Sequence, residues 1–107
     1  MNLKTWWVAL VTFERTAIAQ DILPEDCQGA AGWMACLASD QDEVRRRITA
    51  SLRYVHLHPQ SIDEIAQVSP DEIDEFDAYL AENVQGLEPG KTVVWGTLHT
   101  YLADGEA

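Results

Sequence analysis

The chain has 107 residues, enough for one domain with its own hydrophobic core, and its 47% apolar and 23% charged residues are typical of a globular protein. Its 18 acidic and 7 basic residues give a formal net charge of −11 at pH 7, which disfavours nucleic acids and anionic membranes as partners because both would be repelled. A basic protein, a cationic ligand or a metal ion remains compatible with this charge.

The first predicted element is a strand from Thr5 to Phe13, a stretch rich in aromatic and β-branched residues. Successive side chains of a strand point to opposite faces. One face would carry Trp6, Val8 and Leu10, and the other Trp7, Ala9, Val11 and Phe13. Because both faces are apolar, we expect this strand to be covered on both sides or to contact a partner.

A second apolar run, from Ala30 to Ala38, predicts another strand. Its short length and the glycines Gly29 and Gly32 favour a strand over a helix. The long gap between the two runs suits an antiparallel pair that is joined by a long loop.

Several features favour a cytoplasmic location. The two cysteines, Cys27 and Cys36, stand in a chain with ample apolar sequence, which indicates reduced thiols rather than a disulfide framework. Lys4 and the apolar run after it resemble a short signal peptide, but Glu14 and Arg15 interrupt that pattern. No run approaches the roughly 18 apolar residues of a membrane-spanning helix.

A helix is predicted to begin at Ser39, because Ser39 and Asp42 occupy capping-box positions. Its apolar residues recur at helical spacing and would form a buried stripe. They are Val44, Ile48, Leu52 and Val55. Asp42 and Arg46, like Glu43 and Arg47, are spaced for ion pairs between adjacent turns. Four of the seven basic residues lie on this helix, which we interpret as a solvated face.

A second helix is predicted to begin at Ser69, because Pro70 suits the first helical position and Glu72 completes a capping box. The apolar stripe would consist of Ile73, Phe76, Leu80 and Val84. The opposite side would carry Asp71, Glu75 and Glu82, flanked by Asp74. Asp77 lies close to the apolar stripe, so we expect it to pair with a basic side chain or a backbone donor.

Two further strands complete the predicted elements. The segment from Ser61 to Val68 is predicted to be an edge strand, because its charged residues suit an exposed sheet edge. The segment from Thr92 to Leu102 alternates clearly and predicts the last strand. Within it, Gly96 indicates a bulge or a close approach of another backbone segment.

The predicted order is β-β-α-β-α-β within a single α+β domain, residues 1–107. The simplest closure is a four-stranded antiparallel or mixed sheet with two helices on one face. This architecture resembles the ferredoxin-like sandwich, with the first helix displaced. The resemblance concerns architecture alone and implies no function.

No motif in the sequence specifies a catalytic chemistry: there is no nucleophile elbow, no glycine-rich phosphate loop and no zinc-binding helix motif. His56 and His58 stand two residues apart before Pro59 without a third ligand nearby, so we expect no metal site. Cys36 lies in an apolar run, where burial would raise the pKa of its thiol and lower its reactivity. We therefore expect no cofactor and favour a protein without enzymatic activity.

Half of the acidic residues lie between Ile62 and Glu88, and no Lys or Arg occurs between Tyr54 and Gly90. An acidic segment without basic residues points to a basic protein partner, bound with electrostatic steering. We therefore expect a small protein-binding module, such as an inhibitor or immunity-type protein that neutralises a cationic toxin. The predicted binding residues are Glu64, Asp71, Asp74, Glu75 and Glu82.

Two alternatives remain open from the sequence. The first is a homodimeric small-ligand-binding domain, with or without enzymatic activity, that pairs through its sheet and uses an aromatic sheet face. That face would contain Trp6, Trp7, Trp95, His99 and Tyr101. The second is a domain whose acidic charge serves solubility and whose interaction site lies in the aromatic sheet face.

Overall fold

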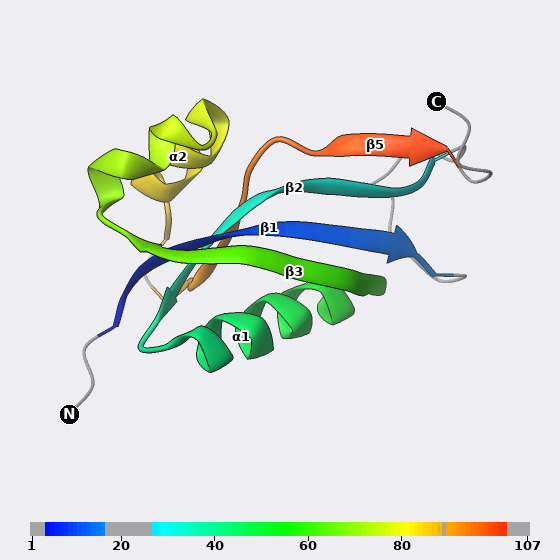
Figure 1. Cartoon of the computed structure of the whole chain (residues 1–107), viewed down its shortest axis with the longest axis horizontal. Coiled ribbons are helices and arrows are strands. Elements are labelled where there is room, and N and C mark those ends of the chain that lie inside the picture. The colour runs from blue at the N-terminus through cyan, green and yellow to red at the C-terminus, as the bar shows by residue number, and fades with distance from the viewer. Residues whose placement is uncertain (1–3, 17–26, 89, 103–107) are drawn as a thin grey trace.

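Five strands and three helical segments make up the part of the chain that the computed structural model describes, which is residues 4–16, 27–88 and 90–102 (Figure 1). The strands are β1 (Thr5–Arg15), β2 (Cys27–Ala38), β3 (Leu57–Val68), β4 (Val93–Trp95) and β5 (His99–Leu102). The helices are α1 (Gln41–Tyr54), the 3₁₀ helix η1 (Pro70–Glu75) and α2 (Ala78–Gln85). All of the strand pairs are antiparallel, so the predicted α+β class with an antiparallel sheet is confirmed.

The sheet has the order β3-β1-β2-β4, and β5 also pairs with β2. β4 pairs with Met34–Cys36 and β5 pairs with Cys27–Ala31, so the two short strands share one edge of β2. The single strand predicted for Thr92–Leu102 is therefore interrupted at residues 96–98. β3 forms the opposite edge of the sheet, as its charged residues predicted.

Two glycines explain where the last strand is interrupted. The Gly96 N–H donates to the carbonyl oxygen of Trp33 at 3.0 Å. A Cβ atom on Gly96 would lie 2.8 Å from that same oxygen, and a Cβ atom on Gly32 would lie 2.3 Å from the carbonyl oxygen of Thr97. Both glycines permit backbone contacts that any side chain would block, so the close approach predicted for Gly96 is confirmed.

The helices α1 and α2 lie on opposite faces of the sheet, so the expectation that both cover one face is wrong (Figure 1). On one face, the stripe of α1 packs against Ala9, Val11 and Phe13. On the other face, Ile73 and Leu80 pack against Val8 and Ala35. Adjacent residues of a strand point to opposite faces, and β1 is apolar on both, so each face needs its own cover. This arrangement differs from a ferredoxin-like sandwich.

Asp77 divides the predicted second helix into η1 and α2. Its side chain accepts a hydrogen bond from the Leu80 N–H at 2.9 Å and so caps α2. Its other carboxylate oxygen accepts from the Thr97 N–H at 3.0 Å, which confirms the backbone donor predicted for this residue. Desolvation alone would raise the pKa of Asp77, but the hydrogen bonds from Leu80, Thr97 and Tyr79 together lower it.

We predict that Gly32→Ala destabilises the protein by at least about 2 kcal/mol, because its new Cβ atom would overlap a backbone oxygen that cannot move alone. The matched control is Gly86→Ala, whose Cβ would make an ordinary contact of 3.7 Å with the Glu82 carbonyl oxygen. Urea unfolding of both variants measures the difference. Equal stability of the two variants would contradict the close crossing of residues 96–98 over Gly32.

Candidate functional site

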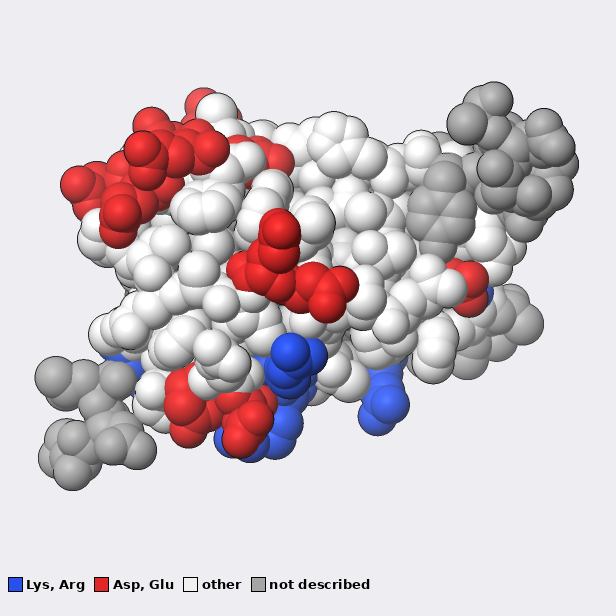
Figure 2. Space-filling view, viewed as in Figure 1, with Lys and Arg blue, Asp and Glu red and all other residues white. Residues whose placement is uncertain are grey.

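Four exposed carboxylates on η1 and α2 form the candidate site, which we call the acidic surface. They are Asp71, Asp74, Glu75 and Glu82. Figure 2 shows acidic side chains gathered at the end of the molecule where these two helices lie. In the described part of the chain, the ion pairs within 4.0 Å join Glu43 to Lys4 and to Arg47. Neither of these ion pairs neutralises the acidic surface.

The local sequence explains why these acids point outward. Ile73 and Leu80 are completely buried on the inner side of η1 and α2, which leaves the opposite side to the acids. The Ser69 N–H and hydroxyl donate to the Glu72 carboxylate at 2.8 and 2.7 Å, and these two bonds lower the pKa of Glu72. Glu72 is thus engaged at the start of η1 and does not belong to the acidic surface.

Glu64, the fifth residue predicted for this surface, lies on β3 instead. It is exposed and has a backbone φ of 51°, at an irregularity in the pairing of β3 with β1. A left-handed conformation is uncommon for a residue other than glycine, and a bulge at this point disturbs the free edge of the sheet. A disturbed, charged edge resists pairing with strands of other molecules.

Basic side chains lie on the other side of the molecule, along α1, with acidic side chains beside them (Figure 2). Arg45, Arg46 and Arg53 are all exposed there, and the Arg45 guanidinium donates to the carbonyl oxygen of Ile62 at 3.0 Å. Asp42 and Arg46, both within the described residues, form no ion pair despite their spacing. The sheet therefore separates the acidic surface from the arginines of α1, although α1 also carries Asp42 and Glu43 in its first turn.

An open groove of about 890 Å³ lies between α2 and the edge formed by β4 and residues 96–98; we call it the α2 groove. Tyr79 lies on its rim with 55% of its surface exposed. Its apolar lining includes the half-buried residues Leu87, Val93, Trp95 and Leu98. Asn83 donates to the Trp95 carbonyl oxygen at 2.8 Å and so ties α2 to this edge. Sequence reasoning missed Tyr79, although helical spacing from Phe76 and Leu80 leaves it outside the buried stripe.

The five aromatic and histidine residues predicted to line one pocket are not brought together. Trp7 and Trp95 pack on the α1 side, where their ring N–H groups donate to Ala38 and Ser51 at 3.0 and 3.2 Å. Trp6 packs on the opposite side. His99 is exposed, and it pairs with Ala31, a residue that points away from the α1 side. The Tyr101 backbone pairs with Gly29. The interruption at residues 96–98 reverses the alternation, so Trp95 and His99 do not share a face.

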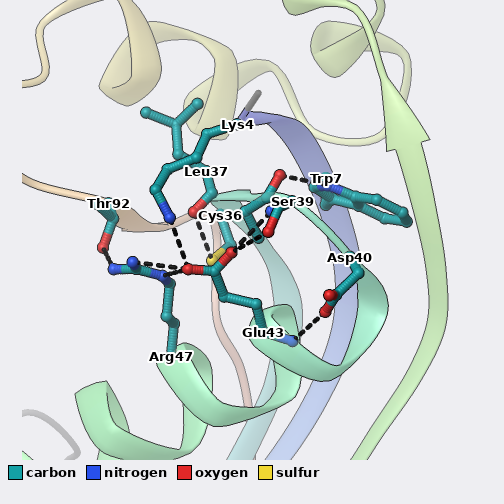
Figure 3. A network of polar contacts seen from close by, with 10 residues as sticks. Lys4, Trp7, Cys36, Leu37, Ser39, Asp40, Glu43, Arg47 and Thr92 are labelled. Carbon is teal, nitrogen blue, oxygen red and sulfur yellow. Dashed lines mark hydrogen bonds and ion pairs between the residues drawn. The ribbon is translucent and has the colours of Figure 1, made fainter. Parts of the chain in front are cut away.

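A second polar cluster surrounds Glu43, the buried charged residue of the described chain (Figure 3). One of its carboxylate oxygens accepts from Lys4 and Arg47, each at 2.7 Å. The other accepts from the Ser39 N–H and hydroxyl at 2.7 and 2.8 Å. Arg47 also donates to the Thr92 hydroxyl at 3.0 Å. With every acceptor position engaged, this carboxylate ties four chain segments together and has no free position for a substrate.

The thiols offer no reactive alternative. Cys27 and Cys36 are both buried, and Cys36 is completely inaccessible. Burial raises the pKa of Cys36 to about 11, against a smaller opposing effect of the nearby Arg47 charge. A thiol with that pKa is protonated at neutral pH, so it behaves as a small apolar residue.

We predict that Glu43 makes stability depend on pH. The hydrogen bond from Lys4, and then those from Ser39 and Arg47, hold the pKa of Glu43 well below its usual range. Its contribution to the free energy of unfolding is therefore complete above the unfolded-state pKa of about 4.3 and is lost as the pH falls toward the lowered folded-state value.

The measurement is urea unfolding of the wild type and Glu43→Gln between about pH 7 and about pH 2. Glu72 and Asp77 also have lowered pKa values, but they titrate in both proteins and cancel in the difference. We expect the wild type to be more stable at neutral pH and the difference to shrink in acid. A difference that does not change with pH would contradict the charged cluster.

Among the described residues, no helix is long and apolar enough to cross a membrane, and no three or more His, Cys, Asp or Glu side chains gather as metal ligands. No protein-family model, curated protein or solved structure matches this chain.

Proposed function

We propose that this chain is a protein-binding module that engages a basic protein through the acidic surface, as an inhibitor or immunity-type protein of a cationic toxin would. The observation that carries the proposal is that the sheet separates the acidic surface from the exposed arginines of α1. The acids on η1 and α2 have no ion-pair partner among the described residues, although arginines are present on α1. An external basic surface supplies the missing counter-charge.

The physical advantage of this arrangement lies in the kinetics of association. Carboxylates of one sign, gathered at one end of a protein with a net charge of −11, attract a basic partner over distances of about a Debye length. Because α1 lies on the other side, its arginines weaken this field less than they would beside η1. Association is then fast and strongly salt-dependent, which suits a protein that must capture a harmful partner quickly.

The carboxylates that are sheltered from water support a binding role over a catalytic one. General acid–base catalysis needs a sheltered group that is free to exchange a proton with a substrate. Glu43 and Asp77 are sheltered, but both are engaged by hydrogen bonds within the fold. The four acids of the acidic surface are instead open to solvent.

The proposal predicts that neutralising two acids of the acidic surface weakens binding of the basic partner more than neutralising two acids elsewhere does. The test variant is Asp71→Asn with Asp74→Asn, and the matched control is Asp42→Asn with Asp63→Asn. Both variants remove two exposed aspartates, and in each pair one stands in the first turn of a helix. Immobilised proteins are incubated with host lysate at low and high ionic strength, and the affinity of the retained basic protein is then measured.

We expect the test variant to bind at least about tenfold more weakly than the control, with retention lost at high ionic strength. Equal weakening by both variants would show that only net charge matters, and the surface would then have no specific role. Retention of no basic protein at low ionic strength would leave solubility as the role of the charge and would overturn the proposal.

A further inference from the structure

We propose that the α2 groove is the anchor site of the basic partner and that it takes an arginine side chain stacked on Tyr79; this inference rests on the proposed function. Tyr79 belongs to α2, as does Glu82 of the acidic surface. The groove therefore begins where the acidic surface ends. A partner held by its charge over η1 and α2 is already beside the groove.

The walls of the groove suit a side chain that is apolar along its length. A volume of about 890 Å³ falls in the range of ligand-binding clefts, and half-buried Leu87 and Leu98 are among its lining residues. Gly96 also lines the groove, where a side chain would overlap neighbouring backbone, so this position adds no bulk to the wall. An exposed tyrosine such as Tyr79 beside such a cleft is typical of the residues that dominate binding energy at interfaces.

The charge around the groove selects a cationic occupant. Glu82 and Asn83 follow Tyr79 by three and four residues on α2, so both stand on its side of the helix. Glu88 and Lys91 line the groove as well, and the lysine offsets the charge of Glu88. Net negative charge therefore remains beside Tyr79, and we place the cation of the occupant there.

Arginine fits these requirements better than lysine does. Its guanidinium is planar and weakly hydrated, stacks on aromatic rings and can donate two hydrogen bonds to one carboxylate such as that of Glu82. Its three-carbon stem can lie along the apolar wall. A lysine ammonium would meet the same charge but would gain less from the face of Tyr79 and would remain strongly hydrated.

The experiment compares a hexa-arginine peptide with a hexa-lysine peptide, which carry equal charge, in binding titrations at low ionic strength. The test variant is Tyr79→Ser, and the matched control is Tyr54→Ser, which removes the 83% exposed tyrosine of α1. Both tyrosines are exposed, so circular dichroism should show that both variants remain folded. Sedimentation of the free proteins reports whether a second copy occupies the groove instead.

We expect the wild type and Tyr54→Ser to bind hexa-arginine about fivefold more tightly than hexa-lysine, and Tyr79→Ser to bind the two peptides equally. Equal affinity of the wild type for both peptides would overturn the proposed arginine site in the groove but would leave the proposed role of the acidic surface intact. If Tyr79→Ser keeps the preference for hexa-arginine, the proposed arginine site on Tyr79 is also overturned. Binding of neither peptide would overturn the proposed function as well.

A further outcome concerns the exposed arginines of α1, which a second copy of the chain could present to the groove. If the wild type and Tyr54→Ser are dimers in sedimentation and Tyr79→Ser is a monomer, the groove serves self-association. That result would overturn the proposal of a basic partner at this site. A monomeric wild type with the expected arginine preference supports the proposal.

Discussion

The complete burial of neighbouring residues on both faces of β1 is the constraint on which the rest of the structure depends. Val8 and Ala9 point in opposite directions, and both are inaccessible to water. A central strand of this kind needs a cover on each side, because leaving either apolar face exposed would forgo about 25 cal/mol for each Å² not buried. α1 supplies one cover, and η1 with α2 supplies the other. The chain must therefore cross the sheet edge between its helices, and β3 makes that crossing.

Polar groups then hold these covers in place. Glu43 joins the start of β1, the end of β2, the first turns of α1 and the segment before β4. Asp77 joins α2 to the interruption between β4 and β5. Such buried, fully bonded carboxylates contribute little net energy but strongly disfavour arrangements that would leave them unpaired. The two clusters thus specify how each cover is placed, while apolar burial supplies most of the stability.

The same two-sided architecture decides how charge is distributed. Because each helix turns its apolar stripe toward the sheet, its charged side faces away, and the two charged sides end up on opposite sides of the molecule. The exposed arginines of α1 are thereby kept away from the acidic surface on η1 and α2. This separation gives the molecule the acidic surface that we propose binds a basic partner. The α2 groove beside the acidic surface would add apolar contacts to such a partner. Affinity depends more on contacts of this kind than on charge.

The sequence by itself determined the elements and the outward acids. The helical spacing of apolar residues located α1 and its buried stripe, and the capping signal at Ser69–Glu72 located the start of η1. Helical spacing also predicted that Asp71 and Glu82 point away from the core. Periodicity reports which side of an element is buried but not what covers it, so the tertiary structure alone decided that the helices take opposite faces. It also decided the break at Asp77, the two short strands around Gly96 and the groove beside Tyr79. Each of these depends on contacts between segments far apart in the chain, such as that of Asp77 with Thr97, which no local pattern encodes.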